Sequence, residues 1–387
     1  MASFTMNNNT SAPSYLIVCF RFIGDVLLTT PLALSIKTDN PDAVVDYLVF
    51  EGTEKVLAKN QHIRNIFTVP RDTSGLRILF SLFRKYDTAI GAYPSDRTAI
   101  AAAIAGKRSV GLTYGLKKEW WKSLVLDIHH VCCDRLHVVS NILMLLWRLE
   151  IEPVPRVVMG YDDSDITFAR DAVPYGDYVV MHPYSMKKYK YWPAKNWAEL
   201  ATLIQERTHS TVVFTRTPDP AGAELLEQIK EHAPQDIRIF DAPCTLNQLA
   251  AILKGATAFV GIDTAVTHMA AALDTPTIAI FGPTLTRYWA PWPNGCLNPS
   301  PFVENKGVQH KKYITVVQKE WQCVPCNKET CRIGRPGVIE CLEKLTVAEV
   351  FVELEKAILA GKHNRALRPG NHAGSGTENE TINVQNA

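Results

Sequence analysis

The sequence lacks a run of apolar residues as long as the ~18–20 residues that a membrane-spanning helix needs. It also lacks an excess of one charge, because 41 Lys and Arg against 39 Asp and Glu give a formal net charge of +2. So small a charge does not indicate a nucleic-acid-binding protein. The opening stretch, residues 1–14, is polar and uncharged and does not have the pattern of a secretory signal. We therefore expect a cytoplasmic protein without a nucleic-acid partner.

Two phosphate-binding motifs are also missing. No G-x-G-x-x-G follows the first predicted strand, Tyr15–Phe20, which argues against a dinucleotide-dependent dehydrogenase. No G-x-x-x-x-G-K-[ST] is present either, which argues against a P-loop ATPase. A phosphate-binding function, if there is one, must use other residues.

Cysteine is present nine times, and in a cytoplasmic protein these are expected to be thiols or metal ligands rather than disulfides. Cys323, Cys326, Cys331 and Cys341 have the spacing C-x₂-C-x₄-C-x₉-C. This spacing is compatible with zinc or an iron–sulfur cluster, and ordinary thiols are the alternative. A metal at this cluster would be structural.

What the sequence does contain is enough chain for two ordinary domains. Its 387 residues include 47% apolar and 21% charged residues, as in soluble globular proteins. Short apolar runs alternate with helical patterns in both halves, which predicts α/β structure with parallel sheets covered on both faces. We expect a disordered tail at 1–14, a first domain at 15–160, a linker at 161–175, a second domain at 176–345, a final helix at 346–363 and a disordered tail at 364–387.

One stretch of the first half, Thr113–Asp134, has no clear period. Long irregular loops in compact domains are usually functional or mobile. Basic and aromatic residues lie together in this stretch: Lys117, Lys118, Trp120, Trp121 and Lys122.

The most informative segment lies in the second half. An apolar run ends at Asp263, an Ala-rich helical pattern opens at Thr264 and Ala265 and contains His268, and a second apolar run follows. This is a strand–helix–strand unit. The helix N-terminus has unpaired N–H groups and the positive end of a dipole, so it suits a phosphate. An ordinary crossover with a capping aspartate is the alternative.

The first half has a related segment after its first strand. Gly24 allows a tight strand-to-helix turn, and Asp25 lies at the helix start, facing the crevice. A helix-capping aspartate is one interpretation. A general base is the other, because a carboxylate can take a proton from a hydroxyl nucleophile.

A lysine-rich segment follows the first strand of the second half. Ser185 and Lys190, with Lys187 and Lys188 between them, suit a diphosphate at the C-terminal end of a strand. A solvated surface loop is the alternative.

These segments together resemble glycosyltransferase family 9, the bacterial heptosyltransferases of lipopolysaccharide core assembly. The resemblance covers Tyr15 to Gly361 and is carried by Gly24-Asp25-Val26, by Lys190-Tyr191-Trp192-Pro193 and by the segment from Gly261 to Thr284. It is closest to the heptosyltransferase III/II subgroup.

The family resemblance implies the GT-B architecture, with an acceptor on the first Rossmann-like domain and a nucleotide sugar on the second. It implies a final helix that packs back on the first domain. It further implies inverting transfer of heptose from ADP-L-glycero-β-D-manno-heptose to the inner core of lipopolysaccharide. No cofactor is expected for catalysis, and we expect a monomer at the cytoplasmic face of the inner membrane.

The resemblance also assigns roles to residues. Asp25 is the expected catalytic base, and Ser185, Lys190 and the N–H groups of Thr264 and Ala265 are expected to bind the leaving ADP. Asp263 is expected to hold hydroxyl groups and His268 to line the cleft. Asp219 matches an acidic residue that binds the ribose, with Glu224 as the alternative. For an anionic, membrane-anchored acceptor we expect contacts from Arg21, Gly24, Arg97, Lys117, Lys118 and Lys122, with Trp120 and Trp121 at the bilayer interface.

Two other functions remain open on sequence. One is a different GT-B enzyme that uses another nucleotide sugar. The second is a metal-binding regulatory protein organised by the cysteine cluster.

Overall fold

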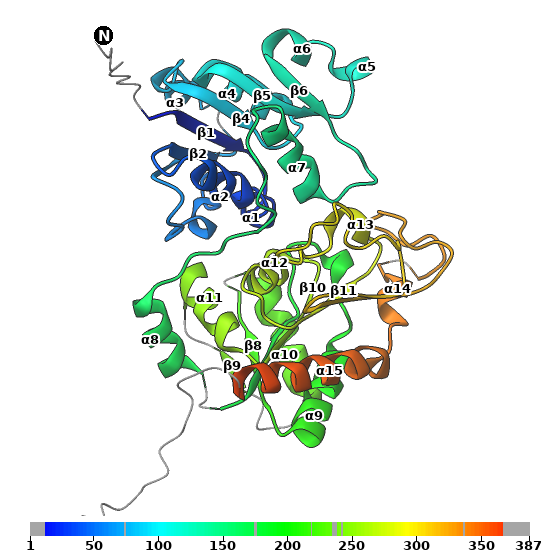
Figure 1. The fold of residues 1–387 in the computed structure, drawn as a ribbon. Coiled ribbons are helices and arrows are strands. Elements are labelled where there is room, and N and C mark those ends of the chain that lie inside the picture. Colours follow the sequence, from blue (N-terminus) through cyan, green and yellow to red (C-terminus); the bar gives the residue numbers. More distant parts are fainter. Residues whose placement is uncertain are drawn as a thin grey trace, which may run out of the picture.

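The computed structural model describes residues 12–72, 75–173, 176–217, 219–233, 238–240, 243–335 and 337–366. Most of the two predicted tails lies outside these ranges. Among the described helices, none is both long enough and apolar enough to span a membrane. Figure 1 shows two α/β halves, one above the other, with the chain crossing between them.

The first half is built on a parallel sheet with strand order β3-β2-β1-β4-β5-β6. Alternate residues of β1 point to opposite faces, as in any strand. Ile17 and Cys19 join the apolar core on one face, and Leu16 and Val18 join the core on the other. The strands are β1 (Ser14–Cys19), β2 (Val44–Phe50), β3 (Asn65–Val69), β4 (Tyr86–Gly91), β5 (Gly106–Thr113) and β6 (Ile128–Val131).

Helices cover both faces of this sheet. Ser95 begins α4 by accepting a hydrogen bond from the N–H of Thr98, and the helix ends before Gly106. The helices of this half are α1 (Ile23–Leu27), α2 (Thr30–Asp39), the 3₁₀ turn η1 (Glu54–Val56), α3 (Leu76–Ser81), α4 (Asp96–Ala105), α5 (Leu116–Glu119), α6 (Lys122–Val125) and α7 (Val138–Trp147).

The second half has a sheet with the order β12-β13-β11-β10-β7-β8-β9, parallel except at the edge pair β12–β13. Its central strands are buried on both faces, which is why they are continuous apolar runs in the sequence. The strands are β7 (Tyr178–His182), β8 (Thr211–Thr215), β9 (Arg238–Phe240), β10 (Ala258–Ile262), β11 (Thr277–Phe281), β12 (Val308–Lys311) and β13 (Ile314–Gln318).

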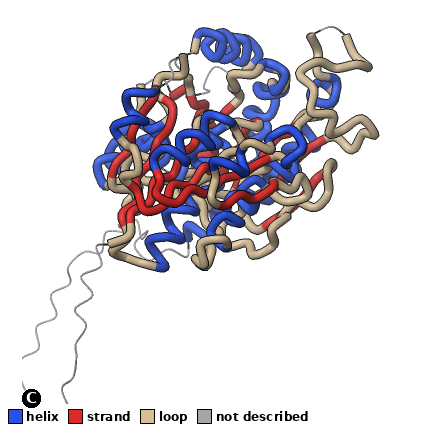
Figure 2. The backbone as a smooth tube through the Cα atoms, turned by 90° about the horizontal axis from the view of Figure 1, so that it is seen from above, coloured by secondary structure: helices blue, strands red, loops and turns tan. Residues whose placement is uncertain are grey.

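The helices of the second half flank this sheet, and Figure 2 shows strands in the interior with helices outside them. A capping box between Thr245 and Gln248 begins α11. The helices are α8 (Asp163–Ala172), the 3₁₀ turn η2 (Lys188–Lys190), α9 (Ala194–Thr208), α10 (Pro220–His232), α11 (Leu246–Gly255), α12 (Ala265–Ala272), α13 (Thr286–Trp289), α14 (Glu340–Glu343) and α15 (Val347–Ala366).

Three expectations differ from the structure. The expected linker contains a regular helix, α8, which has a capping box at Asp162 and packs on α11. The expected irregular loop at 113–134 contains α5, α6 and β6. The final helix does not pack back on the first half: α15 contacts α9, β10, β11 and β13, and Val350, Leu354 and Ile358 lie in the core of the second half.

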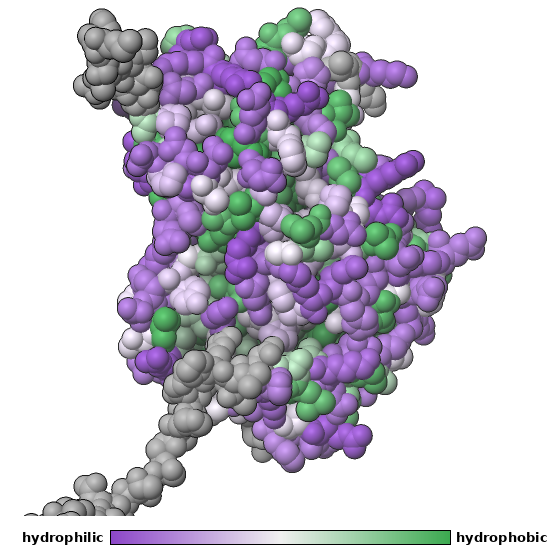
Figure 3. Space-filling model, in the orientation of Figure 1, coloured by the Kyte–Doolittle hydropathy of each residue, from purple (hydrophilic) through white to green (hydrophobic). Residues whose placement is uncertain are grey.

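The two halves meet through apolar contacts. One buried cluster contains Val26 and Leu27 from the first half together with Val266 and Met269 from the second. The segment around Val157, through which the chain crosses between the halves, is also held in place. The side chain of Asn294 accepts a hydrogen bond from the N–H of Val157 and donates one to the carbonyl of Val157. The molecular outline narrows at this level in the space-filling view (Figure 3). The contact brings the C-terminal edges of both sheets towards each other.

Candidate active site

Both sheets contain a point where the strand order reverses, and such points bind ligands in open α/β sheets. In the first sheet it lies between β1 and β4, and in the second between β7 and β10. The segments that follow β1, β7 and β10 carry most of the residues singled out in the sequence. Topology therefore explains why these distant segments face one cleft.

Asp25 is the third residue of α1, the helix that follows β1. The N-cap of α1 is Phe22, so Asp25 is not itself the capping residue, although its carboxylate accepts a hydrogen bond from the backbone N–H of Phe22. Burial raises the pKa of Asp25 above its ordinary value, and the nearby guanidinium of Arg21, 3.7 Å away, partly offsets this. A carboxylate with a raised pKa is a stronger base, as proton abstraction from a hydroxyl requires.

Gly24 serves a different purpose from the one expected. It is absent from the described residues with positive φ, so the turn does not need a left-handed glycine. A Cβ at this position would lie 3.4 Å from Cα of Ala265 and 3.4 Å from Cδ2 of His268. Gly24 therefore allows α1 of the first half to approach α12 of the second half closely.

Lys190 and Asp263 form the most polar contact on the other side of the cleft. Nζ of Lys190 lies 2.6 Å from Oδ2 of Asp263, and both side chains are largely buried. Lys190 ends the 3₁₀ turn η2, and Asp263 follows β10 directly. Both charges act on the pKa of Asp25, so the three side chains belong to one electrostatic site.

The start of α12 lies beside this pair. Thr264 is the N-cap and Ala265 the first helical residue, and the first N–H groups of a helix have no partner within it. Ser185 is buried, and its hydroxyl accepts the N–H of Lys187 at 3.3 Å. Cation, hydroxyl and helix terminus together suit an anion with several oxygens.

His268 is buried in α12 and faces Gly24. Burial lowers its pKa to about 4, so the imidazole is neutral at pH 7. Its Nδ1 has no hydrogen-bond partner within the described part of the chain. A neutral ring with an open nitrogen can bind a hydroxyl group.

Asp219 lies farther along the second half, as the N-cap of α10. Its carboxylate accepts the N–H of Ala221 and the hydroxyl of Tyr184, and the Tyr184 contact is the main cause of its lowered pKa. Glu224 is exposed on the same helix. Asp219 is thus already engaged by two protein donors, and it retains acceptor capacity because a carboxylate has about four lone-pair sites.

The acceptor candidates fall into two groups. Arg21 lies over the ring of Tyr93 at 4.3 Å, and Arg97 lies over Phe20 at 5.1 Å and Phe50 at 4.9 Å, at the cleft edge of the first sheet. Lys117 is exposed on α5, whereas the side chain of Lys118 lies outside the described residues.

The expected contact of Lys122 with an acceptor is wrong. It is fully buried, with Nζ 2.6 Å from Glu119 and 3.2 Å from Asp96. It therefore holds the loop together and does not face an acceptor. Trp121 is partly buried against the core, and Trp120 is exposed.

Sequence reasoning missed three tyrosines at the cleft. The hydroxyls of Tyr93 and Tyr114 lie 3.3 Å apart. The charges of Asp25 and Arg21 act on the pKa of Tyr288, so this side chain lies near them. Tyr93 and Tyr114 follow β4 and β5, and Tyr288 lies in α13, so no local pattern links them. Arg71, over the rings of Phe22 and Phe50, was also missed.

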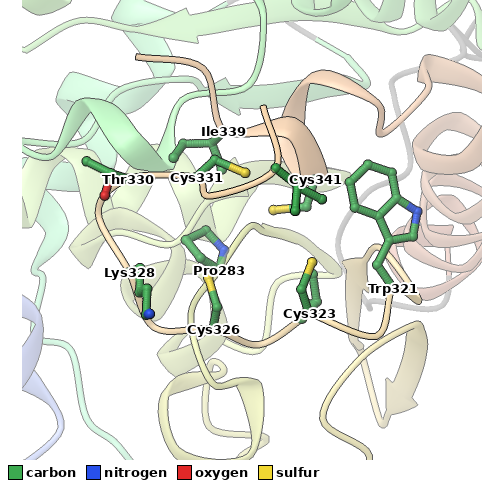
Figure 4. Close-up of a pocket in the computed structure, with 11 residues that line it drawn as sticks. Pro283, Trp321, Cys323, Cys326, Lys328, Thr330, Cys331, Ile339 and Cys341 are labelled. Atoms are coloured by element: carbon green, nitrogen blue, oxygen red, sulfur yellow. The ribbon is translucent and has the colours of Figure 1, made fainter. Parts of the chain in front are cut away.

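The four clustered cysteines line one small cavity of about 20 Å³ next to Pro283 (Figure 4). In the described ranges, no group of three or more His, Cys, Asp or Glu side chains is arranged to hold a metal ion. The same loop reaches the lysine-rich segment through an ion pair of 3.1 Å between Lys187 and Glu329. The cysteine loop thus contacts the lysine-rich segment.

Known proteins resemble this chain in sequence and in fold. The family model "Glycosyltransferase family 9 (heptosyltransferase)" matches residues 77–334. Lipopolysaccharide heptosyltransferase 3 of Escherichia coli is 26% identical over 295 residues, which span 72% of this chain and 86% of that protein.

Two solved structures superpose on most of the chain. E. coli ADP-heptose lipopolysaccharide heptosyltransferase II has a TM-score of 0.68 at 17% identity, covering 90% of this chain and 99% of that one. E. coli heptosyltransferase WaaC with ADP-2-deoxy-2-fluoro heptose has a TM-score of 0.64 at 21% identity, covering 89% and 99%. The predicted α/β fold of GT-B type is confirmed.

Proposed function

Because the chain belongs to glycosyltransferase family 9, we propose that it transfers heptose from ADP-L-glycero-β-D-manno-heptose to the inner core of lipopolysaccharide, with inversion at the anomeric carbon. The heptosyltransferase relatives support the donor and acceptor classes. In this proposal the acceptor binds on residues 15–160 and the donor on residues 176–345.

The observation that carries the proposal is the position of Asp25 opposite the Lys190–Asp263 pair. Gly24 and Ala265 bring the two switch points into contact, and the charges across this contact act on one carboxylate. A base on one domain and an anion site on the other is the arrangement that inverting transfer needs.

The reaction follows from this arrangement. Asp25 takes the proton of an acceptor hydroxyl while the hydroxyl oxygen forms a bond to the anomeric carbon. The bond between that carbon and the β-phosphate oxygen breaks, and its electron pair leaves with ADP. The attacking and leaving oxygens lie on opposite faces of the sugar, so the configuration inverts.

The leaving ADP gains negative charge as the bond breaks. Lys190, Ser185 and the N–H groups of Thr264 and Ala265 stabilise it, with the dipole of α12 behind them. These groups supply the stabilisation, and no step of the proposal uses a metal.

Donor binding must also change the Lys190–Asp263 contact. Without donor, the Asp263 carboxylate neutralises the ammonium. In the complex the phosphates of the donor bind the ammonium of Lys190, and Asp263 then binds hydroxyl groups of the sugar or ribose. His268 lines the cleft between donor and acceptor, and Asp219 binds the ribose.

The acceptor side of the proposal rests on the arginines at the cleft edge. Arg21, Arg71 and Arg97 are stacked on aromatic rings, which holds their guanidinium groups in place for the phosphates and carboxylates of a core oligosaccharide. Such an acceptor is anchored in the inner membrane. We therefore place the protein at the cytoplasmic face of that membrane, as a monomer.

A structural metal at the cysteine cluster is not part of this proposal. Four thiols are a suitable donor set for zinc or iron. Their present arrangement does not form a ligand set within the described residues. We infer instead that the cysteine loop holds the lysine-rich segment in place through the ion pair between Glu329 and Lys187.

Titration calorimetry with three nucleotide sugars tests the donor assignment. ADP-heptose and ADP should bind, whereas UDP-N-acetylglucosamine and GDP-mannose should bind at least about tenfold more weakly, a difference of about 1.4 kcal/mol. Tighter binding of either competitor would favour a different GT-B enzyme.

A further inference from the structure

One face of the first half carries an unusual number of exposed apolar side chains. They lie on α3, α4, α5 and α6 and on the residues next to them, and these helices contact one another in the order α3–α4–α6–α5. Green atoms also mark the upper edge of the molecule in Figure 3, where Figure 1 places α6. The face consists of Leu76, Phe80, Phe83, Ile100, Trp120 and Leu124.

The segment 76–85, which is α3 with the four residues after it, has the features of an interfacial segment. Phe80 is 70% exposed and Phe83 is 59% exposed, while Leu79 and Leu82 between them are buried in the core. The phenylalanines therefore contribute little to packing of the first domain. Single exposed apolar residues are common, but several of them on neighbouring helices indicate an interaction site.

The charge of this face is basic. The segment 76–85 contains Arg77, Arg84 and Lys85, all exposed, and no acidic residue. The nearest acidic side chains on α4 and α5, Asp96 and Glu119, both pair with the buried Lys122. Apolar side chains among exposed cations suit the boundary of an anionic lipid layer.

A second copy of the chain fits this face less well. A symmetric dimer would place the same surface against itself. The exposed cations of the segment 76–85 would then lie against the same cations of the other copy, and this segment has no carboxylate to neutralise them. An anionic bilayer offers the complementary charge instead.

We propose that the face formed by α3, α4, α5 and α6 docks the enzyme on an anionic phospholipid bilayer, with Phe80 and Phe83 inserted at the headgroup boundary. This inference rests on the proposed function in one respect: an enzyme whose acceptor is anchored in a lipid bilayer needs a face that binds the bilayer.

The position of the face relative to the cleft supports the proposal. Helix α3 follows β3 at its C-terminal end, where Arg97 donates hydrogen bonds to the carbonyls of Pro70 and Arg71. Arg71 and Arg97 therefore lie between the apolar face and the cleft that holds Asp25. Sugars of an acceptor whose lipid stays in the bilayer would pass these two cations on the way to the base.

Vesicle sedimentation of the full chain tests the proposal. The test variant is Phe80→Glu/Phe83→Glu, and the control variant is Leu297→Glu/Leu359→Glu, which changes two exposed leucines of the second half. The vesicles are phosphatidylcholine with or without phosphatidylglycerol. Wild type and control should prefer the anionic vesicles, and the test variant should bind them at least about tenfold more weakly.

Two further readouts separate the alternatives. Transfer to a soluble, lipid-free core oligosaccharide should be unchanged in the test variant, which shows that it folds. Sedimentation equilibrium should give the same mass for wild type and test variant. The proposal is overturned by equal vesicle binding of both proteins, by no wild-type binding to anionic vesicles, or by a wild-type dimer that the substitution dissociates. Wild type that binds vesicles but transfers no heptose would contradict the proposed function and leave the docking face intact.

Discussion

Two opposing effects set the basicity of Asp25. Burial disfavours the charged carboxylate and raises its pKa, while Arg21, the N–H of Phe22 and Lys190 favour the charged form. The balance leaves the pKa of Asp25 above its ordinary value, so this carboxylate is more basic than one in water. The same carboxylate is part of the start of α1, so its geometry is fixed before substrate binds.

The first prediction concerns Asp25 as the base. Asp25→Asn keeps the size of the side chain and a hydrogen-bond acceptor for Phe22, so stability should change little. It removes proton abstraction, so kcat should fall by roughly 10²–10⁴. Steady-state kinetics and ADP titration measure the two effects. Asp39→Asn, at an exposed position of α2, is the matched control. Asp25→Asn with more than half of wild-type turnover would exclude the assignment.

A second prediction concerns pH. The base must be ionised, so kcat/KM should fall as pH falls through the pKa of Asp25. Arg21 lowers that pKa, so Arg21→Gln should raise it and move the acidic limb of the pH profile to higher pH. Arg21→Lys keeps the charge and should move the limb less. An acidic limb at the same pH in wild type and Arg21→Gln would contradict the pairing.

Lys190 gives the third prediction. Lys190→Ala removes the cation that binds the diphosphate, a contact worth about 1.5–3 kcal/mol. ADP and ADP-heptose should both bind roughly tenfold to a hundredfold more weakly. Lys188→Ala, in the same 3₁₀ turn but exposed, should bind ADP normally. Equal ADP affinity of the two variants would make Lys190 an ordinary surface lysine.

Sequence reasoning correctly placed residues that follow strands, and their roles stay predictions. Asp25, Lys190 and Asp263 each come directly after, or soon after, an apolar run, and parallel sheets collect such positions at one edge. It failed for Lys122, whose local sequence is that of a solvated loop. Its burial depends on Asp96, which lies on another element. Tyr93, Tyr114 and Tyr288 were missed for the same reason.

Among the elements, the contact between α1 and α12 decides how the two half-sites meet. Both are short helices that follow switch-point strands, and a Cβ at Gly24 would lie 3.4 Å from Ala265 of α12. The sequence indicated both helices, but not that they touch. The motif signalled a glycine, and only the tertiary contact shows that α12 leaves little room for a larger side chain there.

Gly24 therefore carries the fourth prediction. Gly24→Val adds methyl groups against Ala265 and His268, and overpacking of this kind costs about 1–3 kcal/mol. The halves should be held apart, so kcat/KM should fall roughly tenfold to hundredfold while ADP binding, confined to the second half, stays near wild type. Gly24→Ala, whose Cβ has ordinary contacts at 3.4 Å, should be much milder. Wild-type kinetics in Gly24→Val would show that close approach is unnecessary.

Elements at the boundaries were the least predictable. The stretch 161–175 has the polar composition of a linker, yet Asp162 and Asp165 close a capping box and α8 packs on α11. Lys59 of the first half pairs with both aspartates. Composition alone does not distinguish a solvated linker from a helix with one buried face.

For the whole molecule, the main feature is that one apolar core continues across the two halves. The crossing segment is fixed by Asn294, and Asn247 of the second half donates to the carbonyls of Ala58 and Gly160. Such contacts fix the two halves relative to each other. The α/β class and the two halves followed from the alternating pattern, whereas the docking of α15 on the second half did not.

The central claim is that Asp25 and the Lys190–Asp263 pair form one heptosyltransferase site across this cleft. The most direct test is mass spectrometry of a defined inner-core acceptor after incubation with ADP-heptose and the purified protein. The account predicts an acceptor extended by one heptose, with release of one ADP per transfer, and loss of this product with Asp25→Asn. An acceptor that stays unextended with ADP-heptose, but gains a sugar from another nucleotide sugar, would contradict the account.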